Sequence, residues 1–243
     1  MSDIANKVET LMEAMPYLQK YQGKIIVIKY GGNAMINEEL KDAVMHDVVL
    51  LKLLGMKPVL SHGGGPGINK MLEKLNIPVE FIEGLRYTSA DIMRVVEMVL
   101  VGQVNTELVG FINKLGGKAV GLSGVSGDIY HCHQRDEVHG YVGDIDYVDP
   151  KPIFAMLDAG YIPVIAPVGT DGQGHTFNIN GDTAAGKLAS ALGAEKLVIL
   201  TDIEGLCNDI KIRDVISYLN IEDVKALKDK GTIAGGMIPK VDC

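Results

Sequence analysis

Residues 25–32 read Ile25-Ile26-Val27-Ile28-Lys29-Tyr30-Gly31-Gly32, an unbroken β-branched run followed by a lysine and a pair of glycines. An apolar run without polar alternation is typical of a central strand that is covered on both faces. Apolar residues then recur at helical spacing from Glu38 to Leu54. We therefore expect a buried strand that leads through a glycine turn into a helix.

The same order of elements recurs directly afterwards. Pro58-Val59-Leu60-Ser61 predicts a second strand, His62-Gly63-Gly64-Gly65-Pro66-Gly67 forms a glycine-rich turn, and a helical pattern covers Ile68 to Leu75. Strand, glycine turn and helix in series are typical of an α/β fold with parallel strands. The remaining pattern predicts an amphipathic helix over residues 1–22, a helix over 89–115, strands at 119–122, 162–165 and 197–200, an antiparallel hairpin within 129–148, and helices at 183–192 and 221–230.

Composition excludes several classes of protein. The chain has 243 residues, 47% of them hydrophobic, which is enough for a large core. A net charge of -8 argues against nucleic acid as a partner, because a phosphate-backbone binder needs a basic surface. The charged N-terminal residues do not resemble a signal peptide, and we expect no apolar run long enough for a membrane span. Three widely spaced cysteines fit a reducing compartment, so we expect a cytoplasmic protein that binds no membrane.

Two glycine turns are candidate anion sites. Glycines at the end of a strand let backbone N–H groups approach an anion closely, and Lys29 adds a positive charge beside Gly31 and Gly32. The alternative is an ordinary surface lysine on a tight turn, but a cation that ends an apolar strand is costly unless it is paired. Gly63-Gly64-Gly65 matches neither the P-loop nor the dinucleotide fingerprint. We interpret it as a backbone cradle for an oxygen anion.

Other polar residues allow two interpretations each. Asn178, Asn180 and Asp182 alternate, so they share one face of an extended segment, although Asp182 alone could be a plain helix cap. Arg86 suits carboxylate recognition or simply solvent exposure. His62 is interpreted as a packed residue at a strand end rather than as a catalytic group. His131-Cys132-His133 has no second ligand pair at metal spacing, so no metal site is expected.

Taken together, these residues resemble the amino acid kinase superfamily and, within it, the acetylglutamate kinase family. The resemblance is collinear and covers nearly the whole chain. The Arg86 segment and the segment around Lys240 are the stretches most specific to that family. The matching stretches are Val27–Gly32, Ser61–Pro66, Gly84–Thr88, Asn178–Ala185, Leu200–Asp202 and Gly235–Val241.

The resemblance implies a three-layer αβα sandwich with a mostly parallel open central sheet and two lobes. Residues 1–22 would form the N-terminal amphipathic helix. Residues 23–194 would form the amino-acid-substrate and dimerisation lobe, and residues 195–243 the nucleotide-binding lobe. Chains of this family continue beyond the segment that matches Val241, so we expect the nucleotide lobe, and thus the C-terminal part, to be truncated and incomplete.

The implied reaction is ATP-dependent phosphorylation of the side-chain carboxylate of N-acetyl-L-glutamate, which gives N-acetyl-L-glutamyl 5-phosphate in the second step of arginine biosynthesis. Lys29 and Lys240 would flank the transferred phosphoryl group, and Asp182 would hold both lysines. Gly32 and Gly64 would donate backbone N–H groups to it. These five residues are therefore the expected phosphoryl-transfer site.

The resemblance also assigns the two substrates. Acetylglutamate would be held by the residues Gly64, Gly65, Arg86 and Asn178. Thr201 and Asp202 would border ATP, and Mg²⁺ would bind the β- and γ-phosphates of ATP.

Expected partners follow from the same resemblance. They are a homodimer mate, a hexameric assembly through the N-terminal helix, and arginine as a feedback inhibitor. The alternatives are another superfamily kinase, such as glutamate 5-kinase, carbamate kinase or an acetylaminoadipate-type kinase, or a non-catalytic ligand-binding regulatory relative. Retention of Lys29, Asp182 and Lys240 together argues against a protein that only binds.

Overall fold

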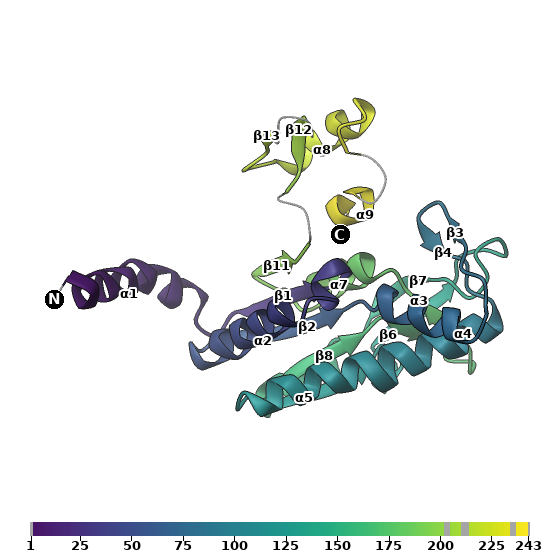
Figure 1. Ribbon diagram of the computed structural model, residues 1–243, viewed down its shortest axis with the longest axis horizontal. Helices are drawn as coiled ribbons and strands as arrows, with labels where there is room; N and C mark the ends of the chain where they lie inside the picture. The colour runs from purple at the N-terminus through teal and green to yellow at the C-terminus, as the bar shows by residue number, and fades with distance from the viewer. Residues whose placement is uncertain (1, 202–204, 210–213, 234–236, 243) are drawn as a thin grey trace.

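The fold is seen in a computed structural model that describes residues 2–201, 205–209, 214–233 and 237–242 (Figure 1). A parallel five-stranded sheet forms its centre, in the order β11-β1-β2-β8-β5. These strands are β1 (Ile25–Tyr30), β2 (Lys57–His62), β5 (Ala119–Ser123), β8 (Ile162–Ala166) and β11 (Lys196–Ile199). All five were expected from their apolar runs, and the predicted α/β class is confirmed.

Helices cover both faces of this sheet. Ile26, Ile28 and Tyr30 point to one face, where they pack in one core with α2 (Glu38–Leu53), α3 (Gly65–Lys74) and the helical run 90–114. Val27 points to the other face, into a second core with α6 (Lys151–Asp158) and α7 (Gly181–Ala191). Because side chains alternate along a strand, an unbroken apolar run fills both cores at once. The three layers follow from that run.

The run 90–114 consists of α4 (Ala90–Glu97), a π-helical stretch η2 (Met98–Asn105) and α5 (Thr106–Lys114). It matches the predicted helix but contains a π-helical stretch that the spacing did not predict. By length and composition it is also apolar enough to cross a membrane, although Asp91, Arg94 and Glu97 interrupt its apolar run. Its buried face, which includes Val96, Leu100 and Leu108, packs on the sheet as a core helix does.

A second, mixed sheet of four strands lies beside the central one. Its hairpin β6 (Tyr130–Gln134) and β7 (Gly143–Val148) confirms the predicted antiparallel hairpin. The strands β9 (Val168–Thr170) and β10 (Thr176–Asn178) are antiparallel to each other, and β9 pairs with β6 in parallel. A short hairpin, whose strands β3 (Phe81–Ile82) and β4 (Leu85–Arg86) have two residues each, was not predicted. Neither was α6, and α3 begins three residues earlier than expected, with Pro66 in its first turn.

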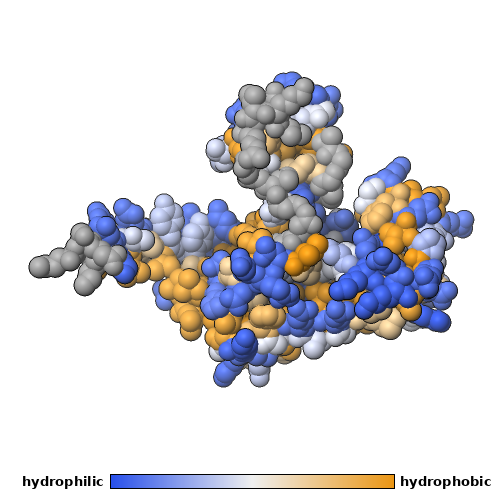
Figure 2. All heavy atoms as spheres, in the orientation of Figure 1, coloured by the Kyte–Doolittle hydropathy of each residue, from blue (hydrophilic) through white to orange (hydrophobic). Residues whose placement is uncertain are grey.

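Two parts of the chain extend beyond the layers of the two sheets (Figure 1). Helix α1 (Ser2–Tyr21) projects from one end, and Leu11, Met12 and Tyr17 on it are exposed. Figure 2 shows apolar side chains along this helix and near its junction with the body. The described C-terminal elements lie above the sheet: β12 (Cys207–Asp209), β13 (Asp214–Val215), α8 (Ile221–Asp229) and α9 (Met237–Asp242).

Candidate active site

The two glycine turns lie side by side because their strands are neighbours in register. Lys29 pairs with Ser61 and Tyr30 with His62, so β1 and β2 end at the same edge of the sheet. The N–H of Gly63 donates to the carbonyl oxygen of Tyr30 at 2.8 Å and joins the two turns directly. The carboxyl ends of parallel strands are where ligands of open α/β sheets bind. The register therefore creates a site at this edge.

Glycine is required at two positions of these turns. Gly32 has φ +67°, a left-handed conformation that L side chains rarely adopt. A Cβ at Gly64 would lie 2.3 Å from Cδ2 of Leu100 on the π-helical stretch. The second turn is therefore pressed against the helix behind it, and its backbone rather than a side chain faces the site.

Asp182 lies between two lysines from opposite ends of the chain. Its Oδ1 is 2.7 Å from Nζ of Lys29, and its Oδ2 accepts a hydrogen bond from Nζ of Lys240 at 3.0 Å. Burial alone would raise the pKa of Asp182, but its ion pairs with Lys29 and Lys240 outweigh that effect and lower the pKa. The carboxylate is therefore charged at neutral pH, and two cations meet at one point beside the glycine turns.

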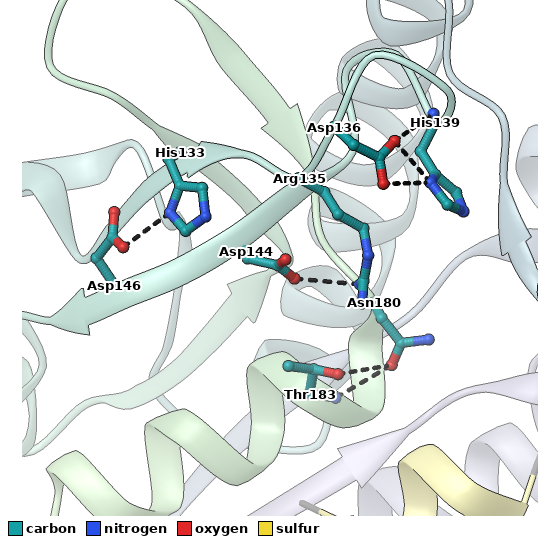
Figure 3. A network of polar contacts seen from close by, with 8 residues as sticks. All are labelled: His133, Arg135, Asp136, His139, Asp144, Asp146, Asn180 and Thr183. Carbon is teal, nitrogen blue, oxygen red and sulfur yellow. Dashed lines mark hydrogen bonds and ion pairs between the residues drawn. The ribbon is translucent and has the colours of Figure 1, made fainter.

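The start of α7 explains why Asp182 is available to the lysines. The expectation that Asp182 could serve as the helix cap is wrong, because Asn180 occupies that position. The Oδ1 of Asn180 accepts from the N–H group of Asp182 at 2.9 Å. It also accepts from the N–H group of Thr183 at 3.1 Å (Figure 3). With the cap supplied by Asn180, the carboxylate of Asp182 keeps both oxygens for ion pairs.

A cavity of about 250 Å³ opens between these elements. Its lining includes both glycine turns, Lys29 and Asp182 at one side, and Arg86 and Asn178. Ile68, Leu85, Val142 and Ile179 add an apolar wall. A cavity with an apolar wall and a few convergent polar groups is typical of a site for a small molecule.

Arg86 enters this cavity from the small β3–β4 hairpin. It is buried, and burial lowers the pKa of its guanidinium. The hydroxyl of Thr88 donates to the carbonyl oxygen of Arg86 at 2.9 Å, and Nδ2 of Asn178 donates to the same hydroxyl at 3.1 Å. The solvated alternative for Arg86 is therefore wrong, and Arg86 and Asn178 are joined through Thr88.

The other expected residues that the structure describes do not line this cavity. Thr201 is half-buried and follows Leu200, whose N–H donates to the carbonyl oxygen of Lys29 at 3.0 Å. Asp202 lies outside the described residues. His131 and His133 each pair with a separate aspartate, Asp128 at 3.4 Å and Asp146 at 2.8 Å (the latter in Figure 3).

His62 is a packed strand-end residue, as interpreted from the sequence. It has no exposed surface, its Nδ1–H donates to the carbonyl oxygen of Gly63 at 2.7 Å, and its Nε2 accepts from Asn105 at 3.1 Å. Burial lowers its pKa to about 4, so the ring is neutral at pH 7. A neutral ring with both nitrogens bonded inside the protein supports the glycine turn rather than performing acid–base chemistry.

Sequence reasoning missed Asn105, which lies at the end of the π-helical stretch. Its Nδ2 is 2.9 Å from the carbonyl oxygen of Val164, 3.2 Å from that of Leu122, and 3.1 Å from His62 Nε2. A Cβ at Gly121 would lie 2.0 Å from its Oδ1. The signal in the sequence was an amide within an apolar helical run, where a buried polar group needs a partner.

Comparison with known proteins gives a consistent picture. The family model "Amino acid kinase family" matches residues 24–243. The acetylglutamate kinase of Heliobacterium modesticaldum is 51% identical over 250 residues, which cover 98% of this chain and 85% of that protein. The acetylglutamate kinase of Carboxydothermus hydrogenoformans is 48% identical over 254 residues, which cover 100% of this chain and 86% of that protein. The crystal structure of smu.665 from Streptococcus mutans UA159 is 32% identical with a TM-score of 0.79, and covers 90% of this chain and 87% of that one.

Proposed function

The chain belongs to the amino acid kinase family, and we propose that it transfers the γ-phosphoryl group of ATP to the side-chain carboxylate of N-acetyl-L-glutamate. The product is N-acetyl-L-glutamyl 5-phosphate, the second intermediate on the route to arginine. The proposal is carried by one observation: two lysines converge on Asp182 beside two glycine turns. Relatives named acetylglutamate kinase at 48 to 51% identity over nearly the whole chain fix the choice of acceptor.

The acceptor needs no general base. A side-chain carboxylate with an ordinary pKa of about 4.3 is already ionised at neutral pH. The barrier is the repulsion between this anion and the phosphoryl oxygens, so catalysis depends on positioning and charge stabilisation. Lys29 and Lys240 supply the positive charge. Asp182 holds their amines at one point without neutralising both, since one carboxylate balances only one of two cations.

The glycine turns would act through their backbone. We assign the N–H groups of Gly32 and Gly64 to the oxygens of the transferred phosphoryl group. Acetylglutamate would lie in the cavity with its side-chain carboxylate toward Lys29, against Gly64 and Gly65. The α-carboxylate of acetylglutamate would then face Arg86. Asn178 would bind the groups around the α-carbon of the substrate.

ATP would bind on the side of Lys240, in the lobe formed by residues 195–243, with Thr201 and Asp202 at its border. Mg²⁺ would neutralise the β- and γ-phosphates. Among the residues that the structure describes, no three acidic, histidine or cysteine side chains gather where a metal ion could bind. In phosphoryl-transfer enzymes Mg²⁺ is commonly held mainly by the phosphates of the nucleotide.

The partners and location are part of the proposal. The apolar face of α1, with Leu11, Met12 and Met15 exposed, would join dimers into a hexamer. Arginine would act as a feedback inhibitor. The negative net charge and the biosynthetic role fit a cytoplasmic enzyme that binds neither nucleic acid nor membranes.

The test is ADP release coupled to NADH oxidation, with ATP, Mg²⁺ and either N-acetyl-L-glutamate or free L-glutamate. We expect ADP release with N-acetyl-L-glutamate and none with free L-glutamate. Turnover with free glutamate would favour a glutamate 5-kinase. Binding of acetylglutamate without ADP release would favour a regulatory relative.

A further inference from the structure

Arg86 is held from two sides by residues that no motif had singled out. Phe81 lies opposite Arg86 across the β3–β4 hairpin, and its ring centroid is 4.9 Å from Cζ of the guanidinium. Asn69 lies on α3, and its Oδ1 accepts a hydrogen bond from Nη2 of Arg86 at 2.5 Å. The carbonyl oxygen of Gly65 is a more distant acceptor for Nη2, at 3.5 Å.

One end of the guanidinium remains without a partner. Nη1 of Arg86 is buried and has no hydrogen-bond partner among the described residues, and no described carboxylate pairs with Arg86. An unsatisfied buried donor on a permanent cation is costly. A ligand with a carboxylate in the cavity that Arg86 lines would satisfy both the donor and the charge.

The side chains of Asn69 and Phe81 both hold Arg86 in ways that keep it able to bind a carboxylate. The amide oxygen of Asn69 is a neutral acceptor, so it fixes Nη2 without cancelling the positive charge. The guanidinium carbon of Arg86 lies over the ring of Phe81, a cation–π contact that uses none of the N–H groups as hydrogen-bond donors. Together they hold the guanidinium from two sides, and neither supplies an acceptor for Nη1. An aspartate at position 69 would instead neutralise the cation.

We propose that Asn69 and Phe81 are positioning residues that orient Arg86 toward the α-carboxylate of the acetylated amino acid. This inference rests on the proposed function, because that function supplies a substrate with a second carboxylate. Neither residue touches the reacting atoms. Their effect is on substrate affinity rather than on the phosphoryl-transfer step.

The experiment compares Asn69→Ala and Phe81→Leu with the wild type in ADP-release kinetics and in calorimetric binding. Glu73→Ala on the exposed side of α3 and Val79→Ala before the hairpin are matched controls. Phe81→Tyr keeps the ring and is the conservative variant. Each protein is assayed with N-acetyl-L-glutamate and with N-acetyl-L-isoglutamine, in which a neutral amide replaces the α-carboxylate.

We expect the KM for N-acetyl-L-glutamate to rise about tenfold in Asn69→Ala, from the loss of a charge-assisted hydrogen bond. In Phe81→Leu it rises about threefold, from the loss of the ring contact. The kcat and the KM for ATP stay within about twofold of wild type, as for the loss of uniform binding. Phe81→Tyr and both controls behave as wild type. With the isoglutamine substrate, the variants match the wild type.

An equal rise in KM for both substrates would mean that the variants disturb the whole cavity rather than the contact with the α-carboxylate, and would overturn the proposal. Unchanged KM values would overturn it too. Asn69→Asp decides the case independently, since it must bind N-acetyl-L-glutamate more weakly than Asn69→Ala, and equal or tighter binding contradicts the proposal. A wild type that binds acetylglutamate without ADP release overturns the proposed function alone, because the dissociation constants still test Asn69 and Phe81. A wild type that does not bind it overturns both.

Discussion

The two lysines that meet at Asp182 come from parts of the molecule that are built very differently. Lys29 is the next-to-last residue of β1, an internal strand whose residues from Ile26 onward are buried, and its side chain is 9% exposed. Lys240 is on α9, a helix of six residues, and its side chain is 23% exposed. Among the described residues beyond Leu192, the one buried hydrophobic side chain is that of Ile233.

The difference shows that Lys29 is fixed by the core, whereas Lys240 belongs to a segment with few buried apolar contacts. Segments with few buried apolar contacts open with a small free energy, whereas core strands open only with global unfolding. The position of Lys29 therefore depends on the whole sheet. The position of Lys240 depends largely on its ion pair with Asp182 and on the packing of α9 against α7.

The largest expected effect is that of Lys29→Ala. It removes a cation from the proposed phosphoryl-transfer site, so we expect kcat to fall about 10³-fold. It also removes one partner of a buried carboxylate, so the free energy of unfolding falls by roughly 3 kcal/mol. ADP release and urea denaturation measure the two effects. Lys24→Ala, on an exposed lysine before the same strand, serves as the control. An unchanged kcat would refute the role of Lys29.

Lys240→Ala tests the contrast between the two lysines, because we expect it to lower kcat with little change in the free energy of unfolding. We expect kcat to fall about 10²-fold. The free energy of unfolding changes by only about 1 kcal/mol or less, since the pair is more exposed and the helix is short. Lys225→Ala on the exposed side of α8 is the matched control. A stability loss as large as that of Lys29→Ala would show instead that the C-terminal segment is as firmly held as β1.

The same contrast explains what could be predicted from the sequence. The run from Ile25 to Ile28 was recognisable because a strand buried on both faces must be apolar throughout. Glycines in a turn likewise reveal where backbone replaces side chains. Asn69 and Phe81 gave no such signal, because their role depends on which side chain they meet across the fold. The hairpin at Glu83-Gly84 was missed since its turn, with φ +50° and +82°, lacks the usual Asn-Gly or Asp-Gly pair.

Asn105 tests whether the core-held side of the site depends on the π-helical stretch. Asn105→Ala removes the donor shared by the carbonyl oxygens of Leu122 and Val164 and by His62. We expect the free energy of unfolding to fall by about 2 kcal/mol, because buried acceptors lose their donor. Gln103→Ala, at an exposed position of the same stretch, should change it by less than about 0.5 kcal/mol. Equal urea midpoints for the two variants would contradict the role of Asn105.

The smallest effect concerns His62, and its sign follows from linkage. Burial lowers the pKa of His62 to about 4 in the folded protein, against about 6.5 in the unfolded chain. Between these values the unfolded state binds the extra proton, so the contribution of the neutral ring is complete above pH 6.5 and is lost as the pH falls toward 4. From pH 7.5 to 5.5 this amounts to about 1 kcal/mol of unfolding free energy. Urea denaturation of wild type and His62→Gln at both pH values isolates it, because the other histidines contribute equally to both proteins. The loss between the two pH values should be smaller in His62→Gln by that amount. An identical loss would mean that water or a rearranged Gly63 turn accommodates the charged ring, and that this side of the site yields more readily than its burial indicates.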